Sequence, residues 1–167
     1  LAKLTTDGSD TPTTFPTGFT RWTITDGGAS GAALSHGFRT LWHIPENNLT
    51  LTIPINNDFS NYDYTVDWGD ATSTTHNSGD ASQGVATHTY TTAGDVTLTI
   101  TGIFPAIQLT DNSGNTQPGA LQLRKVIQWG FGIEWHSCHR AFQGAANLAT
   151  IPTDEAPNLV RVTDCAF

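Results

Sequence analysis

The chain is poor in positive charge. Only seven of its 167 residues are Lys or Arg, against 15 Asp or Glu, and the formal net charge is −8. Binding to a phosphate backbone requires clustered cations, so this composition argues against a nucleic-acid partner. Long apolar runs are also missing, and the longest ones fall far short of the roughly 20 residues that a membrane-spanning helix requires. Residues 1–10 have neither a basic start nor an apolar stretch. We therefore expect neither a signal nor a membrane anchor in this chain.

Methionine is absent and lysine is nearly so, whereas threonine accounts for about one residue in six. Threonine, valine, isoleucine and the aromatic residues suit a pleated, half-buried surface, which favours strands over helices. Hydrophobic residues make up 37% of the chain, and at this length they can form a real core. Abundant Thr, Ser, Asn and Gly with few lysines is typical of secreted bacterial modules. The composition therefore predicts an all-β, extracellular protein.

Alternating apolar residues predict short strands that are separated by turn residues at fairly even spacing. Residues 1–18 are rich in Thr, Asp, Gly and Pro and carry no period, so they are predicted to be a linker or an edge segment. The predicted strands are Phe19–Ile24, Phe38–Trp42, Leu49–Ile53, Tyr62–Trp68, Thr72–His76, Ala86–Tyr90 and Val96–Ile100. Evenly spaced strands without a helical period between them indicate a β-sandwich.

Three motifs in this region carry a family resemblance. They are Val66-Asp67-Trp68-Gly69-Asp70, Thr87-His88-Thr89-Tyr90, and Gly94 followed by Val96–Gly102. Together they resemble the core of polycystic kidney disease (PKD) domains, which implies an immunoglobulin-like β-sandwich over residues 19–104. Ala71 stands where a glycine often follows the aspartate, and Val96 where a tyrosine is usual. A turn that needs a positive φ at position 71 would be strained by alanine.

The pattern changes after Gly102 and becomes repetitive. Ala141-Phe142 recurs as Ala166-Phe167, and Asn147-Leu148 has an echo in Asn158-Leu159. We call the interval from Phe142 to Phe167 the repeat period. It falls within the range of roughly 20 to 29 residues that is typical of leucine-rich solenoids, in which Leu and Asn recur along the chain.

A PKD-like sandwich followed by such repeats resembles the BspA-type leucine-rich-repeat surface proteins of bacteria. The resemblance implies that residues 105–167 begin a solenoid, with about one and a part repeats. It also implies that the chain is an adhesion or interaction module.

Asp67 and Asp70 are the first candidate site. Lying three residues apart around a corner between a strand and a turn, they suit hydrogen bonds to the backbone N–H groups of the turn. A second use is a Ca²⁺ site completed by Asn56, Asn57 or Asp58, because this hard cation prefers oxygen ligands. Acid and base catalysis by the pair is the least favoured use, since nothing in the sequence indicates a cleft between two carboxylates. Beyond this possible calcium, no cofactor is expected.

The two cysteines are the second candidate site. The interval between Cys138 and Cys165 is two residues longer than the repeat period, so the cysteines stack on each other if the second coil is longer by that amount. In that register a disulfide is within reach, whereas in the register of the repeat period the two residues are too far apart. Three uses therefore remain open: a disulfide, buried thiols, or a Zn²⁺ site with His136 and His139.

The sequence favours a binding function over an enzymatic one. It contains no arrangement of a nucleophile and a base, and most of the five tryptophans are expected in the core rather than on a sugar-binding face. A solenoid coil that ends near residue 167 leaves apolar positions unpaired, so Leu159, Val162, Ala166 and Phe167 are the predicted interface. Expected partners are other surface proteins, a host or neighbouring cell surface, or copies of the chain itself. The alternatives are a protomer of an extracellular filament or surface layer, and a carbohydrate-binding module.

Overall fold

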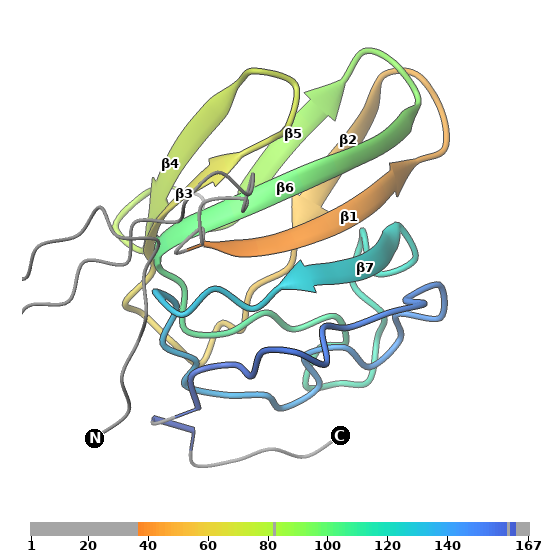
Figure 1. Cartoon of the computed structure of the whole chain (residues 1–167). Coiled ribbons are helices and arrows are strands. Elements are labelled where there is room, and N and C mark those ends of the chain that lie inside the picture. The colour runs from red at the N-terminus through yellow and green to blue at the C-terminus, as the bar shows by residue number, and fades with distance from the viewer. Residues whose placement is uncertain (1–36, 82, 160, 163–167) are drawn as a thin grey trace, which may run out of the picture. The chain divides into compact units, whose positions relative to one another are not determined.

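A computed structural model describes residues 37–81, 83–159 and 161–162, all of which belong to one compact unit (Figure 1). These residues form seven strands: β1 (Phe38–Ile44), β2 (Leu49–Ile53), β3 (Asp63–Asp67), β4 (Ser73–Asn77), β5 (Ala86–Tyr90), β6 (Gly94–Ile103) and β7 (Leu123–Gln128). No helix occurs within these ranges, and therefore none that is long and apolar enough to cross a membrane. The predicted linker 1–18 and the predicted strand Phe19–Ile24 lie outside the described residues.

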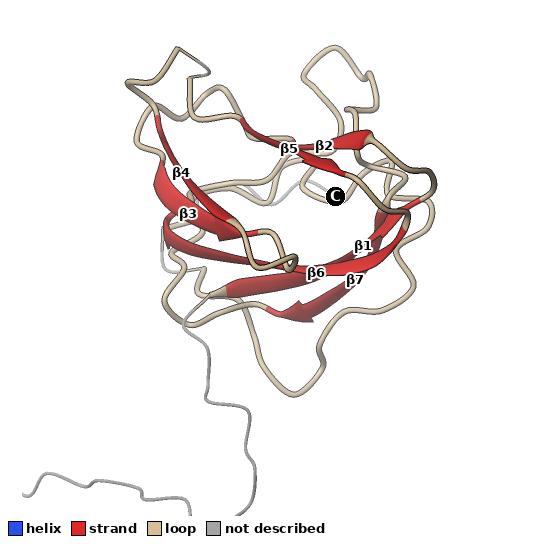
Figure 2. Cartoon of the chain, turned by 90° about the horizontal axis from the view of Figure 1, so that it is seen from above, coloured by secondary structure: helices blue, strands red, loops and turns tan. Residues whose placement is uncertain are grey.

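The strands form two antiparallel sheets. The larger sheet has the order β4-β3-β6-β1-β7, and the smaller one consists of β2 and β5. Figure 2 shows the smaller sheet facing the concave side of the larger one. The all-β prediction is confirmed for the described residues, and two antiparallel sheets around a common core are consistent with the predicted β-sandwich. The six predicted strands that fall in this region all exist, with ends that differ by a few residues.

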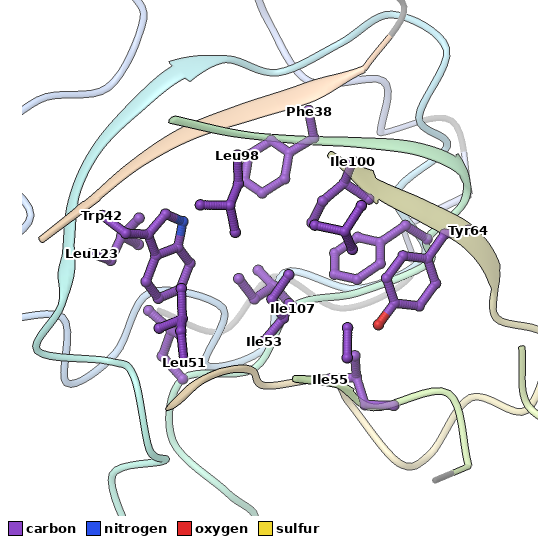
Figure 3. Packing of buried hydrophobic residues seen from close by; sticks show 14 of the residues in the cluster. Phe38, Trp42, Leu51, Ile53, Ile55, Tyr64, Leu98, Ile100, Ile107 and Leu123 are labelled. Carbon is purple, nitrogen blue, oxygen red and sulfur yellow. The ribbon is translucent and has the colours of Figure 1, made fainter. Parts of the chain in front are cut away.

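The core lies between the two sheets because alternate residues of each strand point inward. Tyr62, Tyr64, Val66 and Trp68, predicted to share a face, are all 2% exposed or less. Figure 3 shows side chains of the larger sheet facing those of the smaller one: Trp42, Leu98 and Ile100 on one side, Leu51 and Ile53 on the other. At about 1.5 to 3 kcal/mol for each large apolar side chain, this burial is the main stabilising contribution to the fold.

Residues on both sides of the boundary predicted at residue 104 share this sheet and this core. β7, which follows that boundary, pairs with β1 in an antiparallel register that places Leu41 opposite Lys125. Phe104, Ile107, Leu123 and Val126 belong to the same buried cluster as the strands before them. Beyond β7, the described backbone forms turns, bends and isolated bridges (Figure 1), and no leucine-rich-repeat solenoid is evident there.

The turn after β3 has an unusual backbone. Gly69 has φ 77° and Ala71 has φ 68°, so both residues lie in the left-handed region. At Gly69 a side chain is also sterically excluded, since a Cβ atom there would lie 2.4 Å from the carbonyl oxygen of Thr97. Ala71 has a Cβ atom and adopts this conformation nevertheless. The strain that the sequence suggests for alanine at this position is therefore present.

Candidate functional site

The two aspartates of the predicted metal site bind the turn that follows β3. The Asp67 carboxylate accepts a hydrogen bond from the backbone N–H of Gly69 at 2.9 Å. The Asp70 carboxylate accepts one from the N–H of Thr72 at 3.1 Å and one from its hydroxyl group at 2.5 Å. Each aspartate therefore closes the turn two residues ahead of it, which is the structural use expected of this residue type.

Asp70 also connects the two sheets. Its second carboxylate oxygen lies 2.7 Å from Nε2 of His88, which belongs to β5 in the smaller sheet. The His88 ring stacks on Trp68 with a centroid distance of 4.9 Å, and the hydroxyl group of Tyr90 donates to the carbonyl oxygen of Trp68. The hydrogen bond from the Thr72 hydroxyl group, more than the contact with His88, lowers the pKa of Asp70 below its ordinary value. This cluster fastens the turn of one sheet to a strand of the other.

The calcium prediction at Asp67 and Asp70 stays a prediction. In the part of the chain that the structure describes, no three His, Cys, Asp or Glu side chains gather as they would around a metal ion. The predicted additional ligand Asn56 is buried, and its side-chain oxygen accepts a hydrogen bond from the backbone N–H of Asp58 at 2.9 Å. The Asn56 side-chain oxygen and one carboxylate oxygen each of Asp67 and Asp70 accept hydrogen bonds within their own loops.

The cysteine prediction falls partly outside the described residues. Cys138 is partly buried and lines a small hollow together with Arg140 and Phe142. Cys165, Ala166 and Phe167 lie beyond the last described residue, so the disulfide and two of the four predicted interface residues are not tested. His136 and His139, the other members of the predicted zinc site, are also partly buried.

Beyond β7, one stretch of backbone runs alongside the edge of the fold. We call residues 149–159 and 161–162 the C-terminal segment. It forms isolated parallel bridges between Lys125 and Thr150, which are one repeat period apart, and between Glu134 and Asn158, whose interval is one residue shorter. The N–H of Val126 donates to the carbonyl oxygen of Thr150 at 3.0 Å, and that of Trp135 to the carbonyl oxygen of Asn158 at 3.0 Å. The segment thus lies parallel to the residues about one repeat period before it.

The C-terminal segment carries exposed aliphatic side chains. Ile151 is 53% exposed and Leu159 is 41% exposed, and each directly follows a bridge residue. Of the predicted interface residues, Leu159 is therefore at the surface, whereas Val162 is half-buried and packs against the core. Ile151 is not among the residues predicted from the sequence. Its signal was the repeat period itself, because Ile151 follows Val126 of β7 by that interval.

The tryptophans do not form a sugar-binding face within the described residues. Trp42, Trp68 and Trp135 are 2% exposed or less. Trp129 is partly buried and contacts the rings of Phe38, Trp135 and Phe142. The prediction that most tryptophans belong to the core is confirmed for these four, while Trp22 lies outside the described residues.

Comparisons with known proteins add no assignment, since no family model, no curated protein and no solved structure matches the chain.

Proposed function

We propose that the chain is a non-catalytic module of an extracellular bacterial surface protein, and that the C-terminal segment is its contact surface. The observation that carries this proposal is the pair of parallel bridges at nearly the same interval, next to the exposed side chains of Ile151 and Leu159. Exposed aliphatic side chains along a backbone edge are the kind of surface that a protein partner covers.

The same bridges support the finer proposal about the fold. The intervals that the bridges span agree, to within one residue, with the repeat period between Ala141-Phe142 and Ala166-Phe167. Parallel stacking of backbone at one fixed spacing is how a solenoid grows. We propose that residues 105–167 begin a leucine-rich-repeat stack behind a PKD-like sandwich, as in BspA-type surface proteins. Its partners would be other surface proteins, a host or neighbouring cell surface, or further copies of the chain.

The test is adhesion by beads coated with the purified chain. We expect the beads to bind to bacterial or host cells, and the double variant I151S/L159S to lower binding at least fivefold because it removes the apolar contact. L121S is the matched control, since Leu121 is 52% exposed but lies in the loop before β7. Equal binding by the wild type and the double variant would contradict the proposal, as would an equal loss in the control.

A filament or surface-layer protomer is the second candidate, because the same edge could accept the next copy of the chain. Such a contact is heterologous and does not close, so it produces fibres. Sedimentation velocity distinguishes the two candidates: a concentration-dependent growth of large species that I151S/L159S abolishes would favour the filament, and a constant monomer would favour the adhesive module.

A further inference from the structure

A second surface feature has a lining that does not include Ile151 or Leu159. It is a hollow of about 270 Å³ where chain segments that are distant in the sequence meet. Ile103, the last residue of β6, and the following Phe104 lie on one part of it, and the stretch after β7 contributes Glu134 and His136. The remaining side chains that the argument uses are Asn61 and Arg161. We call this feature the β6 hollow.

The β6 hollow has one apolar wall. Ile103 is 52% exposed, which makes it one of the most exposed large aliphatic side chains of the described fold. The neighbouring Phe104 is 1% exposed and packs its ring against Trp135 at a centroid distance of 6.2 Å. The core holds Phe104, and Ile103 is the side chain of this wall that a ligand would contact. A ligand with an apolar face could lie on it without reorganising the protein.

The rest of the lining is polar, and its charges balance. The Nε–H group of Arg161 donates to the Glu134 carboxylate at 2.7 Å. This bond uses one of the five N–H donors of a guanidinium group and one of the two carboxylate oxygens, so both groups retain hydrogen-bonding capacity. The Asn61 amide adds a donor and an acceptor, and the His136 ring is positioned by an edge contact with Phe59 at 5.8 Å.

These features select the class of ligand. One carboxylate and one guanidinium group cancel in charge, so neither an anion nor a cation gains a net Coulombic attraction. A carboxylate, a guanidinium group and an amide together bind neighbouring hydroxyl groups, since each hydroxyl group both donates and accepts. The volume suits a single ring rather than a drug-sized ligand, because it lies just below the usual range for ligand pockets of about 300 to 1,000 Å³.

We propose that the β6 hollow binds one neutral monosaccharide unit of a surface glycan, with one face of the ring against Ile103 and its hydroxyl groups on Glu134, Arg161 and Asn61. This inference goes beyond the proposed protein contact, because it uses different side chains and a different class of ligand. It also replaces the tryptophan platform as the place where a sugar would bind.

The test is a titration of the ¹⁵N-labelled chain with glucose, galactose, mannose and N-acetylglucosamine, each up to about 50 mM, followed by backbone amide shifts. Few contacts are available to a ligand of this size, so a Kd in the millimolar range is expected for at least one sugar. The shifts should concentrate at residues 61, 102–104, 134–136 and 161. Glucuronate serves as the anionic probe and should bind no better than the neutral sugars.

Two variants test the assignment of the side chains. R161A and I103S should each weaken the binding of the responding sugar at least fivefold, and both change exposed side chains. R39A is the matched control, because Arg39 lies on β1 and not in the hollow. No localised shifts with any neutral sugar, preferential binding of glucuronate, or unchanged affinity in both variants would overturn the inference. I151S/L159S should retain sugar binding, so the two proposals can fail separately.

Discussion

Two positions in the turn after β3, Gly69 and Ala71, show how the chemistry of single residues sets local geometry. Gly69 has a positive φ and no room for a Cβ atom, so glycine is required there. Ala71 has a positive φ of 68° and is tolerated because the surrounding hydrogen bonds hold the turn. Asp70 supplies those bonds from between the two. A short polar motif thus combines one obligatory glycine with one strained alanine.

Replacing Ala71 by glycine should stabilise the protein. Glycine removes the cost of the left-handed conformation, about 1 to 2 kcal/mol, but it also increases the entropy of the unfolded chain, so we expect a net gain of about 1 kcal/mol. The measurement is the free energy of unfolding from urea denaturation. Ala93 is exposed and its φ is not positive, so A93G should lose stability instead. A loss of stability in A71G would show that its φ is not strained.

Asp70 should make the stability depend on pH on the acid side. Its pKa is lower in the folded chain than the ordinary value, chiefly through the Thr72 hydroxyl group, so the ionised form is favoured on folding. This contribution is present above the ordinary pKa and is lost as the pH falls through the folded pKa. D70N should therefore cost about 1 kcal/mol at pH 7 and less at about pH 3.

The matched variant for this pH dependence is T72V, which keeps the carboxylate and replaces the hydroxyl donor by a group of nearly the same shape. Urea denaturation at several pH values should show that T72V loses a large part of the acid-side dependence that the wild type has. If T72V titrates like the wild type, the hydroxyl group is not the dominant cause of the lowered pKa.

At the scale of the elements, six of the seven described strands could be predicted from the sequence and β7 could not, and most of the strand partners could not be predicted either. Alternation identifies a strand because the side-chain period of 2 is a local property, and Tyr62 to Trp68 is the clearest case. Which strand a segment pairs with depends on contacts across long sequence separations. β7 pairs with β1, the first described strand, and nothing local to Leu123–Gln128 indicates this.

The candidate sites divide in the same way: contacts between residues close in the sequence could be predicted, and contacts between distant residues could not. The turn bonds of Asp67 and Asp70 could be predicted, because they reach only two residues along the chain. The contact between Asp70 and His88 joins two sheets and could not. The repeat period predicts which residues the C-terminal segment lies beside. It does not predict that Ile151 is exposed, because exposure depends on the packing of other segments around it. The β6 hollow requires several segments at once and has no sequence signal.

At the scale of the molecule, one core links the predicted sandwich with the predicted solenoid. Buried residues that follow position 104 include Ile107, Leu109, Leu123, Val126 and Trp135, and all of them belong to the cluster formed with the strands before it. A core of this kind unfolds as one cooperative unit. The C-terminal segment extends this unit by backbone hydrogen bonds to residues 124, 126 and 135.

A fragment comprising residues 1–104 should therefore not fold alone. It lacks β7, so one edge of β1 would be unpaired, and the side chains of Phe38 and Trp42 would lose their cover from Trp135 and Leu123. Each of these exposed aromatic residues costs about 1.5 to 3 kcal/mol, and together they approach the roughly 5 to 15 kcal/mol by which domains are stable. Amide dispersion in a ¹⁵N spectrum and urea denaturation of the fragment and the full chain provide the measurement. A fragment with dispersed amides and a sigmoidal transition would show that the sandwich is an independent domain, and that β7 only adds to an edge that is already stable.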